Sequence, residues 1–217
     1  MPEILRLTTG AELRVTGSPG GSAVVCVNGG QAAEVPGTWS STFEWLVDGL
    51  APQFPSLVFG EVRYRVKSWR RLELCIADTH AAIEELGASR TLLMGFSMGG
   101  AVAVSAADAS SVRTVLGLAP WFPEQLSFDP LQGRRLAVLH GSLDRYLPAV
   151  PGVSAASSRR GFERAQALGI DGDYRLIRGG VHGVAVRAPW GRLLPLPRAQ
   201  TWRRLVAAEL DRFEKAG

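Results

Sequence analysis

The chain has 217 residues, a length that suits one α/β domain and is short for two. Apolar residues make up 46% of the sequence, which is enough to fill one large core. The net charge of +4 comes mostly from arginines that alternate with acidic residues and cluster no more tightly than in pairs. A nucleic-acid surface needs a continuous stripe of positive charge, so we expect no nucleic-acid partner.

The N-terminal segment, the lengths of the apolar runs and the cysteines indicate the cellular compartment. The first six residues lack the basic head and apolar stretch of a secretory signal, and no apolar run has the length of a membrane span. Cys26 lies in an apolar run and Cys75 in a predicted helix, so both are expected to be buried free thiols. Together these features favour a cytoplasmic protein with no membrane partner.

Short apolar segments alternate with amphipathic ones along the chain. In chain order the pattern predicts two hairpin strands (Ile4–Leu7, Glu12–Val15), a strand (Ser22–Val27), a helix (Thr42–Leu50), a strand (Ser56–Arg65), a helix (Leu72–Leu86), a strand (Arg90–Met94), a helix of small residues (Gly99–Ala107), two strands (Val112–Leu118, Leu136–His140), a helix around Gly161–Leu168, a strand (Tyr174–Ile177) and a closing helix (Thr201–Lys215).

This alternation predicts an α/β fold over residues 1–217, as a single domain. The central sheet is expected to be mostly parallel, with helices on both faces. Ligands of such sheets bind at the C-terminal ends of the strands. Functional residues are therefore sought just after the predicted strands.

The clearest chemical signal is the sequence Gly95-Phe96-Ser97-Met98-Gly99. An apolar strand precedes it and a helix of small residues follows it, which is the pattern of a nucleophile elbow. Such a turn holds the serine in a strained conformation, so its neighbours must be small, and the two glycines meet that need. The pattern predicts Ser97 as a nucleophile; the alternative is a plain glycine-rich turn.

A serine hydroxyl needs a base to become a nucleophile, and the chain has three histidines. His80 lies inside a predicted helix, where a structural or surface role is expected. His140 ends a strand beside the site, and its ring is expected to point into the packing. His182 follows the last strand in a glycine-flanked loop, so it is the predicted base, with a structural loop residue as the alternative.

The residue that would orient the imidazole is sought among the aspartates that follow strands. Asp144 comes after the strand that ends at His140 and is the predicted acid. Its competitor is Asp129, in a Pro-flanked loop upstream. Asp171 and Asp173 precede the last strand and so belong to the other end of the sheet. An aspartate in a loop can also simply form a turn.

The order Ser97, Asp144, His182 resembles that of the α/β-hydrolase superfamily, and the resemblance covers nearly the whole chain. In that family the second part of the oxyanion hole follows an early strand, in a loop that often reads His-Gly. The matching place here begins with Asn28. By resemblance, the N–H of Met98 and an N–H of Gly30 or Gln31 would form the hole; the alternative is an ordinary Gly-Gly turn.

Many members of this family carry a helical cap, but the segment from Ala119 to Arg135 is too short for one. Trp121 and Phe122 in that segment, together with Trp39, are candidates for the wall of the substrate pocket; they could equally form small satellite cores. A Pro-rich stretch from Ala188 to Pro197 is long enough to fold over the site. The sequence leaves both questions open.

No histidine or cysteine spacing suits a metal, and the glycine-rich segment 17–21 precedes a strand, whereas a phosphate loop follows one. We therefore expect no metal and no cofactor. The predicted activity is hydrolysis of carboxylic esters or thioesters of small molecules through an acyl-enzyme on Ser97. The alternatives are a catalytically silent binding module and a non-hydrolytic enzyme of the same fold, such as a lyase or perhydrolase. The oligomeric state is left open.

Overall fold

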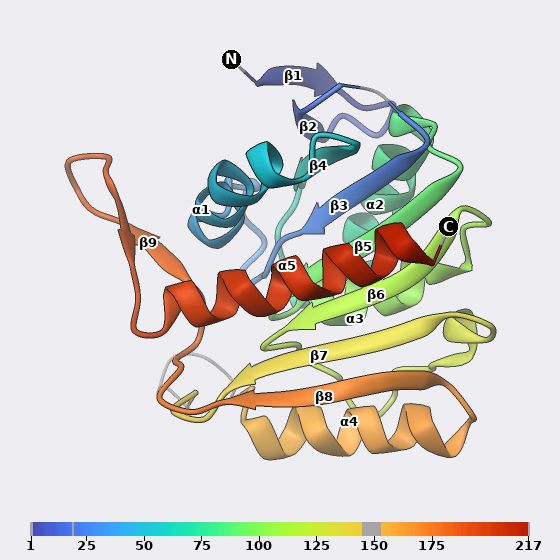
Figure 1. Ribbon diagram of the computed structural model, residues 1–217. Coiled ribbons are helices and arrows are strands. Elements are labelled where there is room, and N and C mark those ends of the chain that lie inside the picture. The colour runs from blue at the N-terminus through green and yellow to red at the C-terminus, as the bar shows by residue number, and fades with distance from the viewer. Residues whose placement is uncertain (1, 19, 145–152, 217) are drawn as a thin grey trace.

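An eight-stranded sheet runs through the middle of the molecule (Figure 1). The computed structural model describes residues 2–18, 20–144 and 153–216. The strands of this sheet are β1 (Glu3–Arg6), β2 (Glu12–Thr16), β3 (Ser22–Val27), β4 (Leu57–Arg63), β5 (Arg90–Phe96), β6 (Val112–Leu118), β7 (Arg135–Gly141) and β8 (Asp171–Ile177). Their spatial order is β1-β2-β4-β3-β5-β6-β7-β8.

The sheet is mostly parallel, as the sequence predicts. β1 and β2 form the expected hairpin, and β2 pairs with β4 in antiparallel fashion. From β4 to β8 all neighbours are parallel. In this register Val27 of β3, Gly95 of β5 and Gly117 of β6 lie side by side. The C-terminal ends of these strands therefore meet at one edge of the sheet.

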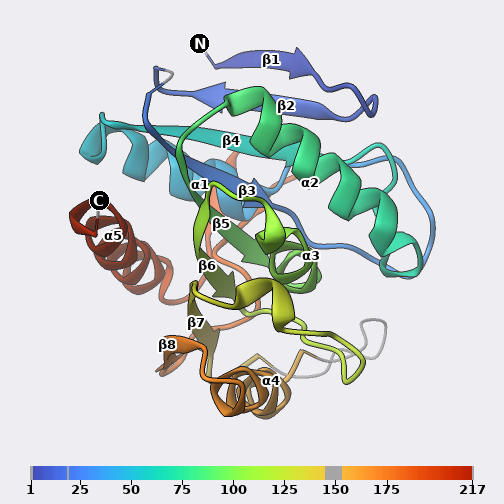
Figure 2. The ribbon, with the colours of Figure 1, turned by 90° about the vertical axis from the view of Figure 1, so that its right-hand side faces the viewer.

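Helices cover both faces of the sheet, which Figure 2 shows from the side. α1 and α5 lie on one face, and α2, α3 and α4 lie on the other. The helices are α1 (Ser41–Leu50), α2 (Leu72–Leu86), α3 (Gly99–Ser105), α4 (Ala155–Ala167) and α5 (Ala199–Lys215). Short 3₁₀ turns are η1 (Ala51–Gln53), η2 (Trp69–Arg71), η3 (Ala106–Asp108) and η4 (Asp129–Leu131).

The central strands are apolar throughout because each buries both of its faces. In β5, Leu93 points into the core beneath α2 and α3, whereas Leu92 and Met94 point into the core beneath α1 and α5. This follows from the alternation of side chains along a strand. Cys26 and Cys75 are buried free thiols, as expected.

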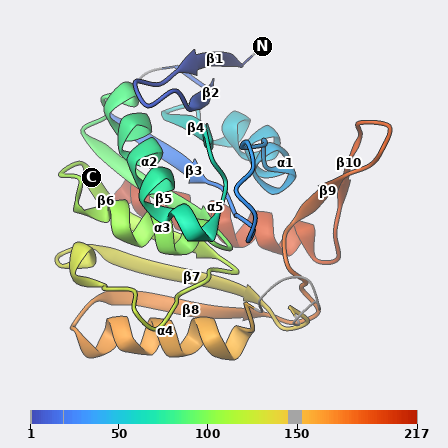
Figure 3. The same ribbon diagram turned by 180° about the vertical axis from the view of Figure 1, so that it is seen from behind.

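The structure differs from the sequence prediction mainly at segment ends and after β8. α4, which contains nearly all of the predicted segment Gly161–Leu168, begins at Ala155, because the side chain of Ser154 caps its first turn by accepting a hydrogen bond from the Ser157 N–H. The Pro-rich stretch contributes β10 (Leu193–Pro195), which pairs with β9 (Ala185–Arg187) just before the stretch to form a second, two-stranded sheet. This hairpin extends away from the molecule beside α1 (Figure 3).

Between β6 and β7 the only regular element is the turn η4, so no large cap is built there. Among residues 2–18, 20–144 and 153–216, no helix combines the length and the apolar character needed to cross a membrane.

Candidate active site

Ser97 follows directly on β5, at the C-terminal edge of the sheet. Its φ of 55° lies in the left-handed region, which side chains other than glycine rarely adopt. The turn is held by the Ser97 N–H, which donates to the Leu118 carbonyl at 3.0 Å, and by the Ser97 carbonyl, which accepts from Trp121 N–H at 2.8 Å. Strain of this kind persists only where surrounding contacts fix it, and it is concentrated at functional sites.

Two glycines make the turn possible because α3 passes very close to the sheet. A Cβ on Gly95 would lie 2.3 Å from the carbonyl oxygen of Gly99. A Cβ on Gly99 would lie 2.0 Å from the carbonyl oxygen of Val27 on the neighbouring strand. The predicted role of small residues around Ser97 therefore has a direct steric cause.

His182 lies in the loop after β8, and its ring reaches the same edge of the sheet. Its Nδ1 lies 2.7 Å from Oδ2 of Asp144, which follows β7. Its ring centroid lies 4.9 Å from that of Phe96, the residue before Ser97. Because Nδ1 donates to the carboxylate, Nε2 is left as the acceptor of the neutral imidazole. Among the described residues, no hydrogen bond joins Ser97 Oγ to this nitrogen.

The loop that carries His182 is fastened to α1. The Val184 N–H donates to the hydroxyl of Thr42 at 3.1 Å, and both groups are buried. Gly183, with a φ of 89°, passes so close to Thr42 that an added Cβ would lie 3.3 Å from the hydroxyl oxygen. These contacts fix the backbone on the C-terminal side of His182.

Asp144 is almost fully buried and accepts hydrogen bonds from two histidines. Burial by itself raises the pKa of this carboxyl, but the bonds from His140 and His182 outweigh it and leave the pKa below its ordinary value. A lowered pKa means that folding favours the ionised form. The resulting contribution to the free energy of unfolding is complete above the ordinary pKa of an aspartate and is lost as the pH falls through the lowered one.

The His140 ring is fully buried, in agreement with the expected orientation into the packing, and it also faces Asp144. Its Nε2 lies 3.0 Å from Asp144 Oδ2 and 3.1 Å from the Val153 carbonyl oxygen, and both partners are acceptors. Its Nδ1 lies 2.7 Å from the Ser158 hydroxyl, which can donate. Because both partners of Nε2 are acceptors, this nitrogen carries a proton and donates to them. The signal in the sequence was a histidine four residues before the acid, at the end of the same strand.

The predicted oxyanion loop lies against the elbow. A Cβ on Gly30 would lie 2.1 Å from the sulfur of Met98, so these two residues are immediate neighbours. Among the described residues, the backbone N–H groups of Gly30, Gln31 and Met98 donate to no protein acceptor. Asn28 accepts from the Gly29 N–H at 2.7 Å and donates to the Thr38 carbonyl at 2.8 Å. The loop is thus ordered with asparagine at this position.

The three aromatic candidates occupy two different places. Trp121 and Phe122 line a groove of about 820 Å³ that runs along α4. Phe122 is also a core residue, since it is 3% exposed and packs edge-on against Phe128. Trp39 lies beneath the guanidinium groups of Arg14 and Arg63, with the nearer of these 4.7 Å from its ring centroid. It thus packs against an arginine pair on β2 and β4.

The residues considered as competitors lie elsewhere. Asp129 is exposed and bonded to Ser127 at the start of η4. Asp171 and Asp173 belong to the first half of β8, at the opposite edge of the sheet. His80 pairs with Asp108 at 3.3 Å on the surface of α2.

Comparison with known proteins gives matches only at the level of structure. No protein-family model matches the chain, and no curated protein matches its sequence. An α/β hydrolase from a deep-sea metagenome library is similar with a TM-score of 0.62, at 19% identity, over 84% of each chain. A dienelactone hydrolase from Anabaena variabilis has a TM-score of 0.67, at 14% identity, over 96% of this chain and 95% of its own.

An esterase from Exiguobacterium antarcticum is similar over 99% of this chain and 100% of its own, with a TM-score of 0.64 and 13% identity. The chain has the α/β-hydrolase fold. In this α/β-hydrolase fold, Ser97, Asp144 and His182 follow β5, β7 and β8 respectively, all at the C-terminal edge.

The close crossing of α3 over β3 predicts that Gly99→Ala is strongly destabilising. The added Cβ meets backbone atoms that cannot rotate away, so we expect a loss of about 3 kcal/mol or more in the free energy of unfolding. Urea denaturation measures it. Gly21→Ala is the control, because its Cβ would lie 3.8 Å from the nearest atom, the Ser89 hydroxyl oxygen. Equal stability of the two variants would contradict the steric argument.

The bond from His140 predicts a change in the titration of Asp144. His140→Phe keeps the packing but removes the donor from a buried carboxylate, so the pKa of Asp144 should rise. His140→Gln places an amide N–H near the position of Nε2 and should preserve most of the lowered pKa. Carbon NMR of the carboxyl group across the acidic range measures both. An unchanged pKa in a folded His140→Phe protein would argue against the assigned bond.

Proposed function

We propose that this protein is a serine hydrolase that cleaves carboxylic ester or thioester bonds of small substrates. The observation that carries the proposal is the pair formed by Asp144 and His182, held beside a serine with a strained backbone. A buried carboxylate fixes the imidazole with its proton on Nδ1, which leaves Nε2 as a base. The similarity to an esterase and a dienelactone hydrolase supports the same class of reaction.

In the proposed reaction, Ser97 Oγ attacks the carbonyl carbon while His182 Nε2 takes the hydroxyl proton. The carbonyl oxygen becomes an oxyanion. When the tetrahedral intermediate collapses, the bond to the leaving alcohol or thiol breaks and His182 returns the proton to it. Water then attacks the acyl-enzyme with the same base, and the acid product and free Ser97 are formed.

The oxyanion would be stabilised by backbone N–H groups of Met98 and of Gly30 or Gln31. These donors have no protein acceptor among the described residues, and Met98 also stands at the first turn of α3. Donors of this kind are effective because they are oriented before the reaction and need not reorganise as charge develops.

The groove lined by Trp121 and Phe122 is the proposed path for the acyl or leaving group. Its residue Trp121 is joined to the elbow, since the Trp121 N–H is bonded to the Ser97 carbonyl, although Ser97 and His182 do not themselves line the groove. Its walls along α4 carry Arg160, Glu163 and Arg164 as well as apolar atoms. We infer that the substrates are small or slender and partly polar. Trp39, packed against arginines, would contribute at most an outer wall.

Ser97→Ala should abolish turnover of short-chain esters while the fold persists. Loss of the nucleophile should lower kcat by about 10⁴ to 10⁶. Steady-state hydrolysis of a chromogenic acetate ester measures it, and Ser110→Ala, a change at an exposed serine, serves as the matched control.

A fluorophosphonate probe tests the same serine independently. Ser97 Oγ should form a bond to phosphorus with loss of fluoride, and Ser97→Ala should remain unlabelled. Wild-type protein that neither hydrolyses esters nor takes the label would favour a silent binding module. Labelling without ester hydrolysis would favour a non-hydrolytic reaction on the same fold.

The two candidate acids give a paired prediction. Asp144→Asn should lower kcat by about 10⁴, because the amide no longer holds the imidazole in the reactive tautomer. Asp129→Asn should leave kcat nearly unchanged, since that carboxylate is bonded to Ser127 on the surface. Parallel rate measurements with one ester decide between them, and the reverse pattern would show that Asp144 has been assigned the wrong role.

A further inference from the structure

β8 is the last strand of the sheet, and no other strand of the described residues pairs with its outer side, the β8 edge (Figure 2). The Ile177 carbonyl accepts from the Ser142 N–H at 2.9 Å, so the backbone groups of Ile177 point toward β7. Because the backbone groups of successive residues in a strand point to opposite sides, those of Gly172, Tyr174 and Leu176 point outward. Among the described residues, the N–H and carbonyl groups of these three residues have no protein partner. Such an edge is a template for a further strand.

The β8 edge lacks the features that usually protect an edge strand from pairing. It has seven residues, contains no proline, and pairs with β7 along its whole length without a bulge. The strand at the other end of the sheet, β1, has four residues and follows Pro2. On β8, Arg175 and Leu176 are exposed, and Leu176 keeps 46% of its surface in contact with solvent. A long, regular edge of this kind is suited to cover by another strand.

The charged residues of β8 stand on either side of Tyr174. Asp173 comes before it and pairs with Arg135 and with Arg212 of α5. Arg175 comes after it, on the same face of the sheet, because alternate residues of a strand share a face. Arg175 has no carboxylate partner among the described residues. A strand with opposite charges on either side of one residue is complementary to an antiparallel copy of itself.

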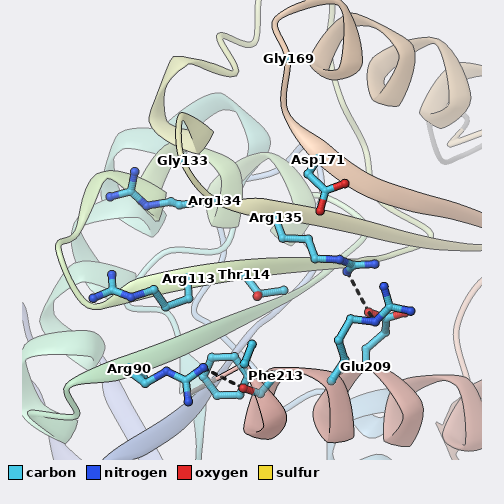
Figure 4. Close-up of a pocket in the computed structure, with 12 residues that line it drawn as sticks. Arg90, Arg113, Thr114, Gly133, Arg134, Arg135, Gly169, Asp171, Glu209 and Phe213 are labelled. Carbon is cyan, nitrogen blue, oxygen red and sulfur yellow. Dashed lines mark hydrogen bonds and ion pairs between the residues drawn. The ribbon is translucent and has the colours of Figure 1, made fainter.

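A second carboxylate lies on the same face, at the N-terminal end of β8. Asp171 borders a pocket of about 400 Å³ that Arg90, Arg113 and Arg134 also line (Figure 4). Figure 4 shows the side chains of Arg113 and Arg134 directed away from Asp171. Asp171 has no cationic partner among the described residues. A cation that approaches the β8 edge from outside would therefore meet two carboxylates, those of Asp171 and Asp173.

The flank of the edge on the other face of the sheet also carries both signs of charge. The Arg159 guanidinium of α4 lies 4.2 Å from the centre of the Tyr174 ring. Glu163 follows one helical turn later on α4 and is exposed. Neither flank of the β8 edge is therefore of a single sign that would repel a second copy.

We propose that two copies of this chain pair through their β8 edges and form a dimer with one continuous sheet. The two strands run antiparallel about a two-fold axis at Tyr174. Tyr174 then faces Tyr174 of the second copy, and Gly172 faces Leu176 of the second copy. Each of these pairs exchanges both of its N–H to carbonyl bonds, so all the outward groups find partners. Asp173 lies directly opposite Arg175 of the second copy, and the reverse contact is made as well.

The charges select this register among its neighbours. An axis at Asp173 or at Arg175 would also pair the outward groups, but it would place two like charges directly opposite each other. In the proposed register the exposed Leu176 side chain lies over Gly172 of the second copy. Gly172 cannot carry a side chain, because a Cβ there would lie 1.7 Å from the carbonyl oxygen of Leu136. The dimer does not rest on the proposed hydrolase activity.

Sedimentation velocity of the whole protein over a range of concentrations tests the proposal. At high concentration the wild-type protein should sediment as a dimer, with twice the chain mass of 23.3 kDa. Arg175→Glu should raise the Kd of the dimer about tenfold or more, because both opposed pairs become like-charged. Arg175→Lys keeps the charge and should dimerise nearly as wild type does. The matched control is Arg6→Glu, the same change of charge on the other edge strand, which should leave the Kd unchanged.

Amide hydrogen exchange locates the interface. The outward amides of Gly172, Tyr174 and Leu176 should become protected as the protein concentration rises, and Arg175→Glu should remove that protection. The amides of Asp173 and Arg175 face β7 and should be protected at every concentration.

A proline in the edge tests the backbone bonds themselves. Leu176→Pro removes one outward N–H and leaves the bonds to β7 in place, so the variant, folded by circular dichroism, should be monomeric. Leu176→Ala keeps the N–H and should still dimerise. A wild-type protein that stays monomeric at its highest soluble concentration would overturn the proposal. A dimer whose outward amides exchange rapidly, or one that survives unchanged in Arg175→Glu or in a folded Leu176→Pro protein, would overturn it as well.

Discussion

The close contact between α3 and the strands β3 and β5 is the constraint on which the candidate site depends. Without side chains at residues 95 and 99, the helix packs directly on backbone carbonyls, and the chain between them must turn sharply. That turn gives Ser97 its positive φ and lifts the residue to the edge of the sheet. The strain, of order 1–3 kcal/mol for such a residue, is balanced by the hydrogen bonds of the turn and by burial around it.

The same edge collects the other polar groups because parallel strands end together. His140 lies at the end of β7 and Asp144 follows that strand, while the loop after β8 carries His182. Asp144 Oδ2 accepts from both histidines, so a charge that would be costly to bury has two donors on one oxygen. Ser158 and Tyr174 extend this network on the far side of His140, with their hydroxyl oxygens 3.0 Å apart. The orientation of the His140 imidazole therefore depends on the packing of α4, which carries Ser158, against β8, which carries Tyr174.

The two edges of the sheet have different chemistry. At the C-terminal edge, histidines surround one carboxylate, and backbone N–H groups stand open beside a serine. At the N-terminal edge, most of the charged side chains are arginines, and several of them donate hydrogen bonds to backbone carbonyls at the ends of strands and turns. Since the arginines are dispersed along the sequence, only the parallel arrangement of β5 to β8 gathers them in one pocket. Dispersed charge in a sequence therefore does not exclude a local concentration of charge in the fold.

The sequence by itself determined the helices and strands, and those functional features that depend only on residues adjacent in the chain. The apolar strands, the elbow around Ser97 and the absence of room for a cap between β6 and β7 all follow from local pattern and length. Residues 183–197 could not be predicted as a hairpin, because its three-residue strands carry too short a pattern and contain proline. The bond between the buried His140 ring and Asp144 was missed, because nothing in the local sequence sets the direction of a ring at the end of a strand. Only the tertiary structure decided that Asp144 lies between two histidines and that Arg90, Arg113 and Arg134 share a pocket, because these are contacts between strands whose register and order no single segment encodes.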